Sequence, residues 1–92
     1  MDEAEGTFTI VNALGLHARA AAQLVKVANR YAQAETEVAC EDQSVNAKSI
    51  MGVLMLAAAQ GMVVTVRCRG QGAAQCLSEI GELIRGRFGE PR

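Results

Sequence analysis

The sequence is poor in aromatic residues, with no tryptophan, one tyrosine and two phenylalanines among 92 residues. So few aromatic side chains exclude the base-stacking platform with which proteins hold single-stranded nucleic acid. A formal net charge of -1 gives no broad attraction to nucleic acid either. The longest apolar stretch, residues 53–59, is far too short to cross a bilayer. We therefore expect neither nucleic-acid binding nor membrane insertion.

Cysteine and histidine are also scarce. The three cysteines, Cys40, Cys68 and Cys76, are odd in number and form no C-x-x-C pair. This pattern argues against a disulfide framework and for a reducing compartment. A single histidine leaves no Cys/His zinc site, so no metal is expected. Residues 1–6 are acidic and lack both the basic flank and the apolar run of a secretory signal, which favours a cytoplasmic location.

What the chain does contain is the pattern of one folded domain, residues 1–92, with a core over about 7–87. Half of its residues are hydrophobic. Alternating apolar residues predict strands, and apolar residues at helical spacing predict helices. The predicted strands are 7–11, 36–40, 44–47 and 62–69, and the predicted helices are 17–31, 50–59 and 73–87. Helices that each bury one apolar face require a common sheet, so this β-α-β-β-α-β-α order predicts an α+β, two-layer sandwich.

The candidate site is a histidine at the start of the first predicted helix. Gly15 permits a sharp turn, and His17 then falls at or beside the helix N-cap. The backbone N–H groups of Ala18, Arg19 and Ala20 have no helical partner there, so they can hold an anion. The positive end of the helix disfavours imidazolium and leaves a neutral, nucleophilic nitrogen. A phosphoryl group carried on that nitrogen would lie within reach of Arg19, and imidazole would release it readily.

A plainer interpretation stays open on these residues alone. A lone histidine in a small domain is more often a surface or capping residue without chemistry. An α/β sandwich of this element order could also bind a small ligand, although no residue points to such a pocket.

Two segments resemble one known family. Residues 15–19, GLHAR, followed by Ala21 and Ala22, resemble the active-site segment of the histidine-containing phosphocarrier proteins, the HPr family of the bacterial phosphotransferase system. Residues 44–52, SVNAKSIMG, resemble that family's second signature. The separation of the segments fits, and the likeness extends over about residues 7–87.

The resemblance implies a four-stranded antiparallel sheet, order 1-4-2-3, with three helices on one face. It also implies that phosphoenolpyruvate phosphorylates enzyme I, which passes the phosphoryl group to Nδ1 of His17 for delivery to a IIA domain. Such a chain is a monomeric phosphoryl-transfer intermediate, not an enzyme that turns over substrate, and it needs no cofactor.

Ser49 matches the serine that an ATP-dependent HPr kinase/phosphorylase modifies in some bacteria. A phosphate at a helix start is favoured by the helix dipole, and it would place negative charge beside the surface that docks enzyme I. Ser49 is in any case expected to cap the short helix. The alternative function is therefore a regulatory binding module that Ser49 phosphorylation switches, or a nitrogen-type branch of the phosphotransferase system.

Apolar residues surround the short helix, so one face cannot bury them all. Methionine suits a surface that meets several partners. We expect Val53 and Leu56 inside and Met51 outside. By resemblance, the residues that dock enzyme I and IIA are Leu16, Ile50, Met51 and Leu54.

The sequence departs from the family at Ala20, where a proline usually follows the active-site arginine. Alanine is an excellent helix former, so the fold should survive. The substitution instead puts in doubt how rigidly His17 is held, and with it the transfer rate.

Overall fold

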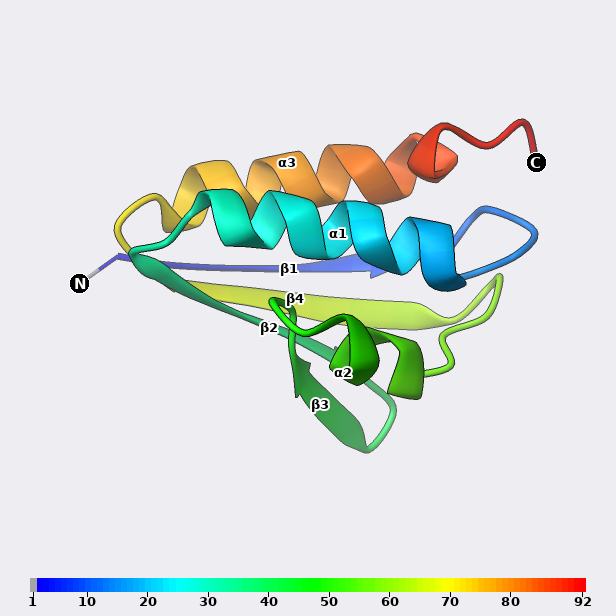
Figure 1. Ribbon diagram of the computed structural model, residues 1–92, viewed down its shortest axis with the longest axis horizontal. Helices are drawn as coiled ribbons and strands as arrows, with labels where there is room; N and C mark the ends of the chain where they lie inside the picture. The colour runs from blue at the N-terminus through cyan, green and yellow to red at the C-terminus, as the bar shows by residue number, and fades with distance from the viewer. Residues whose placement is uncertain (1) are drawn as a thin grey trace.

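The computed structural model describes residues 2–92, and its element order agrees with the order predicted from the sequence (Figure 1). The elements are β1 (Glu3–Thr9), α1 (Ala18–Arg30), β2 (Ala34–Cys40), β3 (Gln43–Asn46), α2 (Ile50–Met55), β4 (Val63–Gly70), α3 (Ala73–Arg85) and the 3-10 turn η1 (Arg87–Gly89). No helix in this part of the chain is long and apolar enough to cross a membrane.

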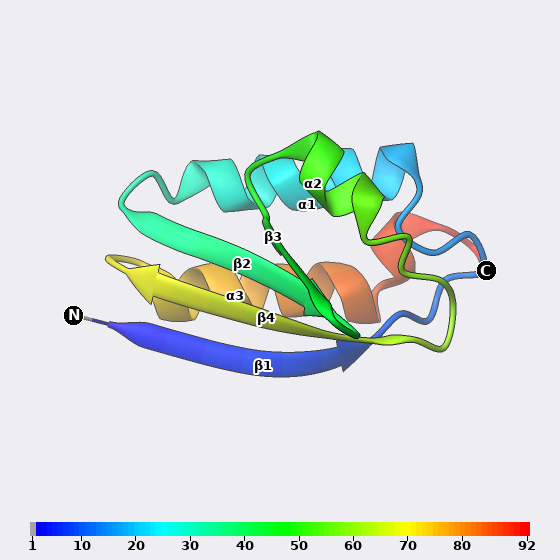
Figure 2. The same cartoon turned by 90° about the horizontal axis from the view of Figure 1, so that it is seen from below.

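The four strands form one antiparallel sheet in the order β1-β4-β2-β3, which confirms the predicted fold class. Helices α1 and α3 lie side by side over one face of the sheet, and α2 lies beside α1 near β3 (Figures 1 and 2). The sheet's other face has no helix over it among the described residues (Figure 2). This is a two-layer, open-faced sandwich.

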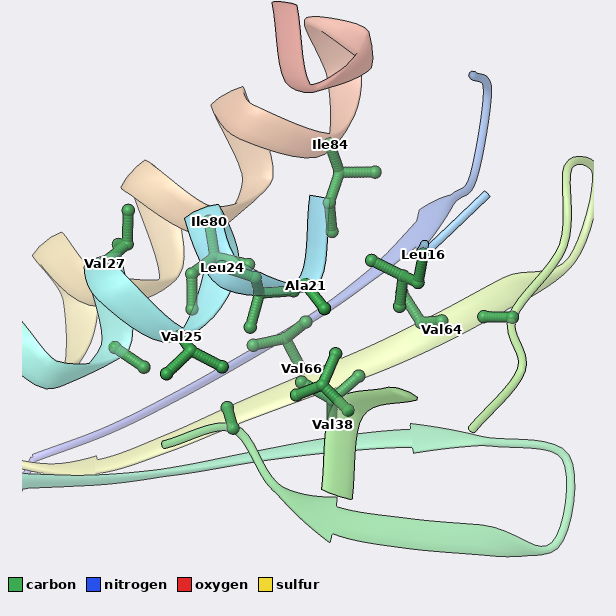
Figure 3. Close-up of a cluster of buried hydrophobic side chains, with 14 of the residues drawn as sticks. Leu16, Ala21, Leu24, Val25, Val27, Val38, Val64, Val66, Ile80 and Ile84 are labelled. Carbon is green, nitrogen blue, oxygen red and sulfur yellow. The ribbon is translucent and has the colours of Figure 1, made fainter. Parts of the chain in front are cut away.

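The core lies between the helices and the covered face of the sheet (Figure 3). Val64, Val66 and Cys68 of β4 point into it, as their alternation predicts. Leu24 of α1 and Ile80 of α3 are fully buried against them. The apolar stripe of each long helix therefore fixes how that helix lies on the sheet.

Charged side chains occupy the open face. Arg67 on β4 pairs with Glu5 on β1 at 2.7 Å and with Glu37 on β2 at 3.0 Å. Arg69 pairs with Glu3 at 3.3 Å. The first strand thus begins at Glu3, four residues before the predicted Thr7, because these acidic residues find basic partners on the neighbouring strand.

Helix α2 is shorter than predicted. It begins after Ser49, as expected, but ends at Met55 rather than near residue 59. Ala57 has a φ of +49°, a left-handed conformation that a helix cannot continue through. The following segment then turns towards β4.

Candidate functional site

His17 lies at the N-cap of α1, as predicted from the sequence. Its backbone is extended, with φ -74° and ψ -179°, and the first helical hydrogen bond runs from Ala21 N–H to the His17 carbonyl at 2.8 Å. The ring's Nδ1 accepts a hydrogen bond from the backbone N–H of Arg19 at 3.3 Å. The side chain is 26% exposed, so the ring is anchored yet reachable.

The turn before His17 depends on a close backbone approach. Gly15 has a φ of +67°, and a Cβ added there would lie 2.5 Å from the carbonyl oxygen of Ala58. That same oxygen accepts a hydrogen bond from Leu16 N–H at 2.9 Å. Only glycine fits both the conformation and the space, so the turn that delivers His17 is tied to the segment after α2.

Sequence reasoning missed one group at the site, the carboxylate of Glu90. Glu90 Oε2 pairs with His17 Nε2, and the Glu90 side chain is only 5% exposed. The hydrogen bond from His17, followed by one from Asn12, holds the pKa of this carboxyl below its usual range. The carboxylate therefore stays charged against the imidazole ring.

The tail after α3 is shaped to bring Glu90 to this position. Arg87, Phe88 and Gly89 have φ values of +59°, +54° and +77°, three left-handed residues in succession. Phe88 is buried in the core and anchors the turn. The tail then reaches the loop before His17, where Ala13 N–H donates to the Arg92 carbonyl at 3.0 Å. Figure 1 shows this segment at the same end of the molecule as the start of α1.

The two contacts of the ring define its chemistry. Because Nδ1 accepts from an N–H group, its lone pair is unprotonated, and the ring proton lies on Nε2, facing Glu90. Ala21 is the first residue whose N–H makes a helical hydrogen bond, so the N–H groups of Ala18 and Ala20, which directly follow His17, have no helical partner. Ala20 is buried and Arg19 is exposed.

Within residues 2–92, no group of three His, Cys, Asp or Glu residues could hold a metal ion.

Exposed apolar side chains near His17 in sequence and on α2 form what we call the apolar rim, defined as Leu14, Ile50, Met51 and Met55. Val53 and Leu56 are buried and Met51 is exposed, as predicted. Leu54 is half-buried. The expectation for Leu16 is wrong, because its side chain is 4% exposed and points into the core beside Val64 (Figure 3).

Ser49 caps α2, since its Oγ accepts a hydrogen bond from Gly52 N–H at 3.1 Å. The residue is half-buried. Helix α2 packs against α1, the helix that His17 precedes. Ser49 and His17 therefore lie at the starts of two helices of the same layer.

The fold alone places the chain among small open-faced α+β sandwiches. Residues 4–86 match the family model PTS-HPr, the PTS HPr component phosphorylation site. Phosphocarrier protein HPr of Xylella fastidiosa (strain Temecula1) is 44% identical over 86 residues, which cover 94% of this chain and 96% of that protein. The chain therefore belongs to the HPr family, the phosphocarrier proteins of the phosphotransferase system.

Solved structures agree with this assignment. The crystal structure of HPr from Thermoanaerobacter tengcongensis has a TM-score of 0.92 and 37% identity, covering 97% of this chain and 99% of that one. An HPr dimer from the same organism has a TM-score of 0.76 and 37% identity, covering 90% of this chain and 94% of that one.

Proposed function

We propose that His17 accepts a phosphoryl group at Nδ1 from phospho-enzyme I and passes it to a IIA domain. The observation that carries this proposal is the pair of contacts on the ring: Arg19 N–H to Nδ1, and Nε2 to the Glu90 carboxylate. Together they keep Nδ1 unprotonated at the start of a helix, where an anion is stabilised.

The transfer needs no proton movement. The Nδ1 lone pair attacks phosphorus, the bond between phosphorus and the donor breaks, and its electron pair stays with the donor. Because Nε2 keeps its proton, the phosphorylated ring becomes an imidazolium, whose positive charge the Glu90 carboxylate balances. The same protonated ring is a good leaving group when a IIA domain attacks the phosphorus.

The phosphoryl oxygens need donors as the group arrives. The N–H groups of Ala18 and Ala20, at the start of α1, lie outside the helical ladder and can supply them. The Arg19 N–H joins them once phosphorus takes the Nδ1 lone pair to which it donates. The exposed Arg19 guanidinium adds a positive charge that can pair with the phosphoryl oxygens. Alanine at position 20 adds an N–H that proline would lack, at the cost of a less constrained first turn.

The apolar rim fits the docking of protein partners. Ile50 and Met51 of α2 are exposed, and Leu54 on the same helix is half-buried. Leu14, in the loop before His17, is 67% exposed, and we infer that it supplies the docking contact expected of Leu16. We infer docking of enzyme I and IIA here, with the protein acting in the cytoplasm as a monomer.

A second function rests on Ser49. Its Oγ is the N-cap acceptor of α2, so a phosphate added there would lie at the positive end of that helix and beside the apolar rim. We propose that an HPr kinase/phosphorylase uses ATP to modify Ser49 and thereby weakens docking of enzyme I. In this regulatory function the chain acts by binding, and its transfer reaction is secondary.

Labelling separates the two functions. Enzyme I with phosphoenolpyruvate should add one acid-labile phosphate per chain, and His17→Ala should abolish it while Ser49→Ala retains it. An ATP-dependent kinase should add an acid-stable phosphate that persists in His17→Ala and is lost in Ser49→Ala. Failure of several enzymes I to label the folded wild-type protein would reject the carrier function.

A further inference from the structure

Asn12 connects the active-site loop to the tail through its side chain. It is fully buried, and its Nδ2 donates to the Gly15 carbonyl at 2.9 Å and to Glu90 Oε1 at 3.0 Å. Glu90 in turn uses its other oxygen, Oε2, to hold Nε2 of His17. A chain of hydrogen bonds therefore runs from a buried amide, through a carboxylate, to the imidazole.

The orientation of this amide is set by its two acceptors. Both Gly15 O and Glu90 Oε1 require a donor, so only the NH₂ group of Asn12 can face them. The Asn12 Oδ1 is buried and has no hydrogen-bond partner within residues 2–92. An aspartate at this position would be almost the same shape but would turn acceptor oxygens towards two acceptors.

We propose that Asn12 is a positioning residue for phosphoryl transfer that acts through Glu90. Its amide fixes the Glu90 carboxylate so that Oε2 faces Nε2 of His17, which keeps the ring proton on Nε2 and the Nδ1 lone pair available. This role rests on the proposed function, because it concerns transfer at Nδ1.

Asn12 also has a local task that must be separated from this role. Gly15 N–H bonds to the Asn12 carbonyl at 3.2 Å, and the Asn12 side chain returns to the Gly15 carbonyl, which closes the turn before His17. If turn closure were the whole role of Asn12, replacing it would have the same effect whether or not residue 90 carries a carboxylate. Coupling between positions 12 and 90 is therefore the decisive measurement.

The experiment compares Asn12→Ala, Glu90→Gln and the double variant with the wild type. Two quantities are measured: the ¹⁵N chemical shifts of the His17 ring, which report the tautomer, and the initial rate of phosphorylation by enzyme I. We expect each single variant to lower the rate about tenfold or more and to raise the fraction of rings protonated at Nδ1. The double variant should be no slower than Glu90→Gln.

A carboxylate–amide exchange provides a rescue test. Asn12→Asp should be the slowest single variant, because it sets a second carboxylate against Glu90. Adding Glu90→Gln restores a donor–acceptor pair, because the new amide NH₂ at position 90 can donate to the carboxylate at position 12. The amide oxygen at position 90 can still accept from Nε2 of His17, so the rate should partly recover. Asn29→Asp is the control, since Asn29 Nδ2 also donates to two carbonyls, Val25 at 3.0 Å and Lys48 at 3.5 Å, away from Glu90.

A measurement on the wild type covers the case in which the Asn12 variants do not fold. On acidification, the Asn12 side-chain amide signals and the Glu90 carboxyl signal should shift with one midpoint.

Three results would each overturn the proposal: separate midpoints, a wild-type tautomer in folded Asn12→Ala, or an effect of Asn12→Ala that is unchanged by Glu90→Gln. Because the tautomer is read without phosphorylation, its loss in Asn12→Ala supports positioning of the ring even if enzyme I labels nothing. A wild-type protein that is not labelled rejects the carrier function instead.

Discussion

Replacing Gly15 with alanine should be among the most damaging single-methyl changes in this protein. Gly15 has a φ of +67°, where a residue with a Cβ costs about 1–2 kcal/mol. The new Cβ would also lie 2.5 Å from the Ala58 carbonyl oxygen, which is backbone and cannot rotate away. Relieving such an overlap costs about 1–3 kcal/mol, and the Leu16 N–H bond to the same oxygen, worth about 1 kcal/mol, would be strained or lost. We expect a loss of about 4 kcal/mol in the free energy of unfolding.

Gly61→Ala is the matched control for this change. Gly61 has a φ of +90°, so it pays a similar conformational cost, but a Cβ there would meet no atom within 4 Å. Urea unfolding should show that Gly15→Ala is at least about 2 kcal/mol more destabilising than Gly61→Ala. Gly15→Ala should also slow phosphorylation of His17 by about tenfold or more, because it moves the turn that delivers the ring. Equal losses of stability in the two variants would refute the close approach between Gly15 and Ala58.

Three further predictions concern the core, the site and the far end of α1. Leu24→Ala should lower the free energy of unfolding by about 3 kcal/mol, because Leu24 is fully buried, while the folded variant still labels at His17; urea unfolding and labelling check this. The pKa of Glu90 lies below its unfolded value of about 4.3, so its contribution to stability is present above that pH and is lost as pH falls through the lower native value. The stability difference between the wild type and Glu90→Gln should therefore shrink on acidification below about pH 4, and a constant difference would contradict the pairing with His17. Tyr31 donates a hydrogen bond to Glu79, which raises the pKa of the phenol to about 12. Ultraviolet titration of this single tyrosine should show a midpoint near that value, and the midpoint should return towards about 10 in Glu79→Gln.

The sequence allowed the start of α1 to be predicted because its signals are local. Gly15 interrupts the preceding pattern, and apolar residues at helical spacing follow His17 at once. Local signals also predicted that Ser49 precedes α2 and that alternate residues of β4 point into the core. The strand order within the sheet came from the family resemblance, since strand pairing is not a local property.

The role of Glu90 could not be predicted from local patterns. Its contact with His17 joins residues 73 positions apart in the sequence. That contact depends on Arg87 and Phe88 adopting left-handed conformations that residues other than glycine rarely take. The only local signal is Phe88, an apolar residue after the end of a helix that must find a place in the core.

Two smaller errors have the same origin. Glu3 and Glu5 look like part of a polar terminus until Arg69 and Arg67 are placed opposite them on β4. Leu16 directly precedes a half-buried histidine, and its inward direction becomes clear only from its backbone bond to Ala58. In each case a distant segment decides the environment of the residue.

The pairing of His17 with Glu90 also affects when the protein becomes competent during its synthesis. A ribosome adds the histidine long before it adds the glutamate 73 positions later. Under the proposed function, a nascent chain therefore has the accepting ring before it has the carboxylate that orients it. Unfinished or proteolytically clipped copies should consequently compete poorly with mature protein for phosphorylated donors.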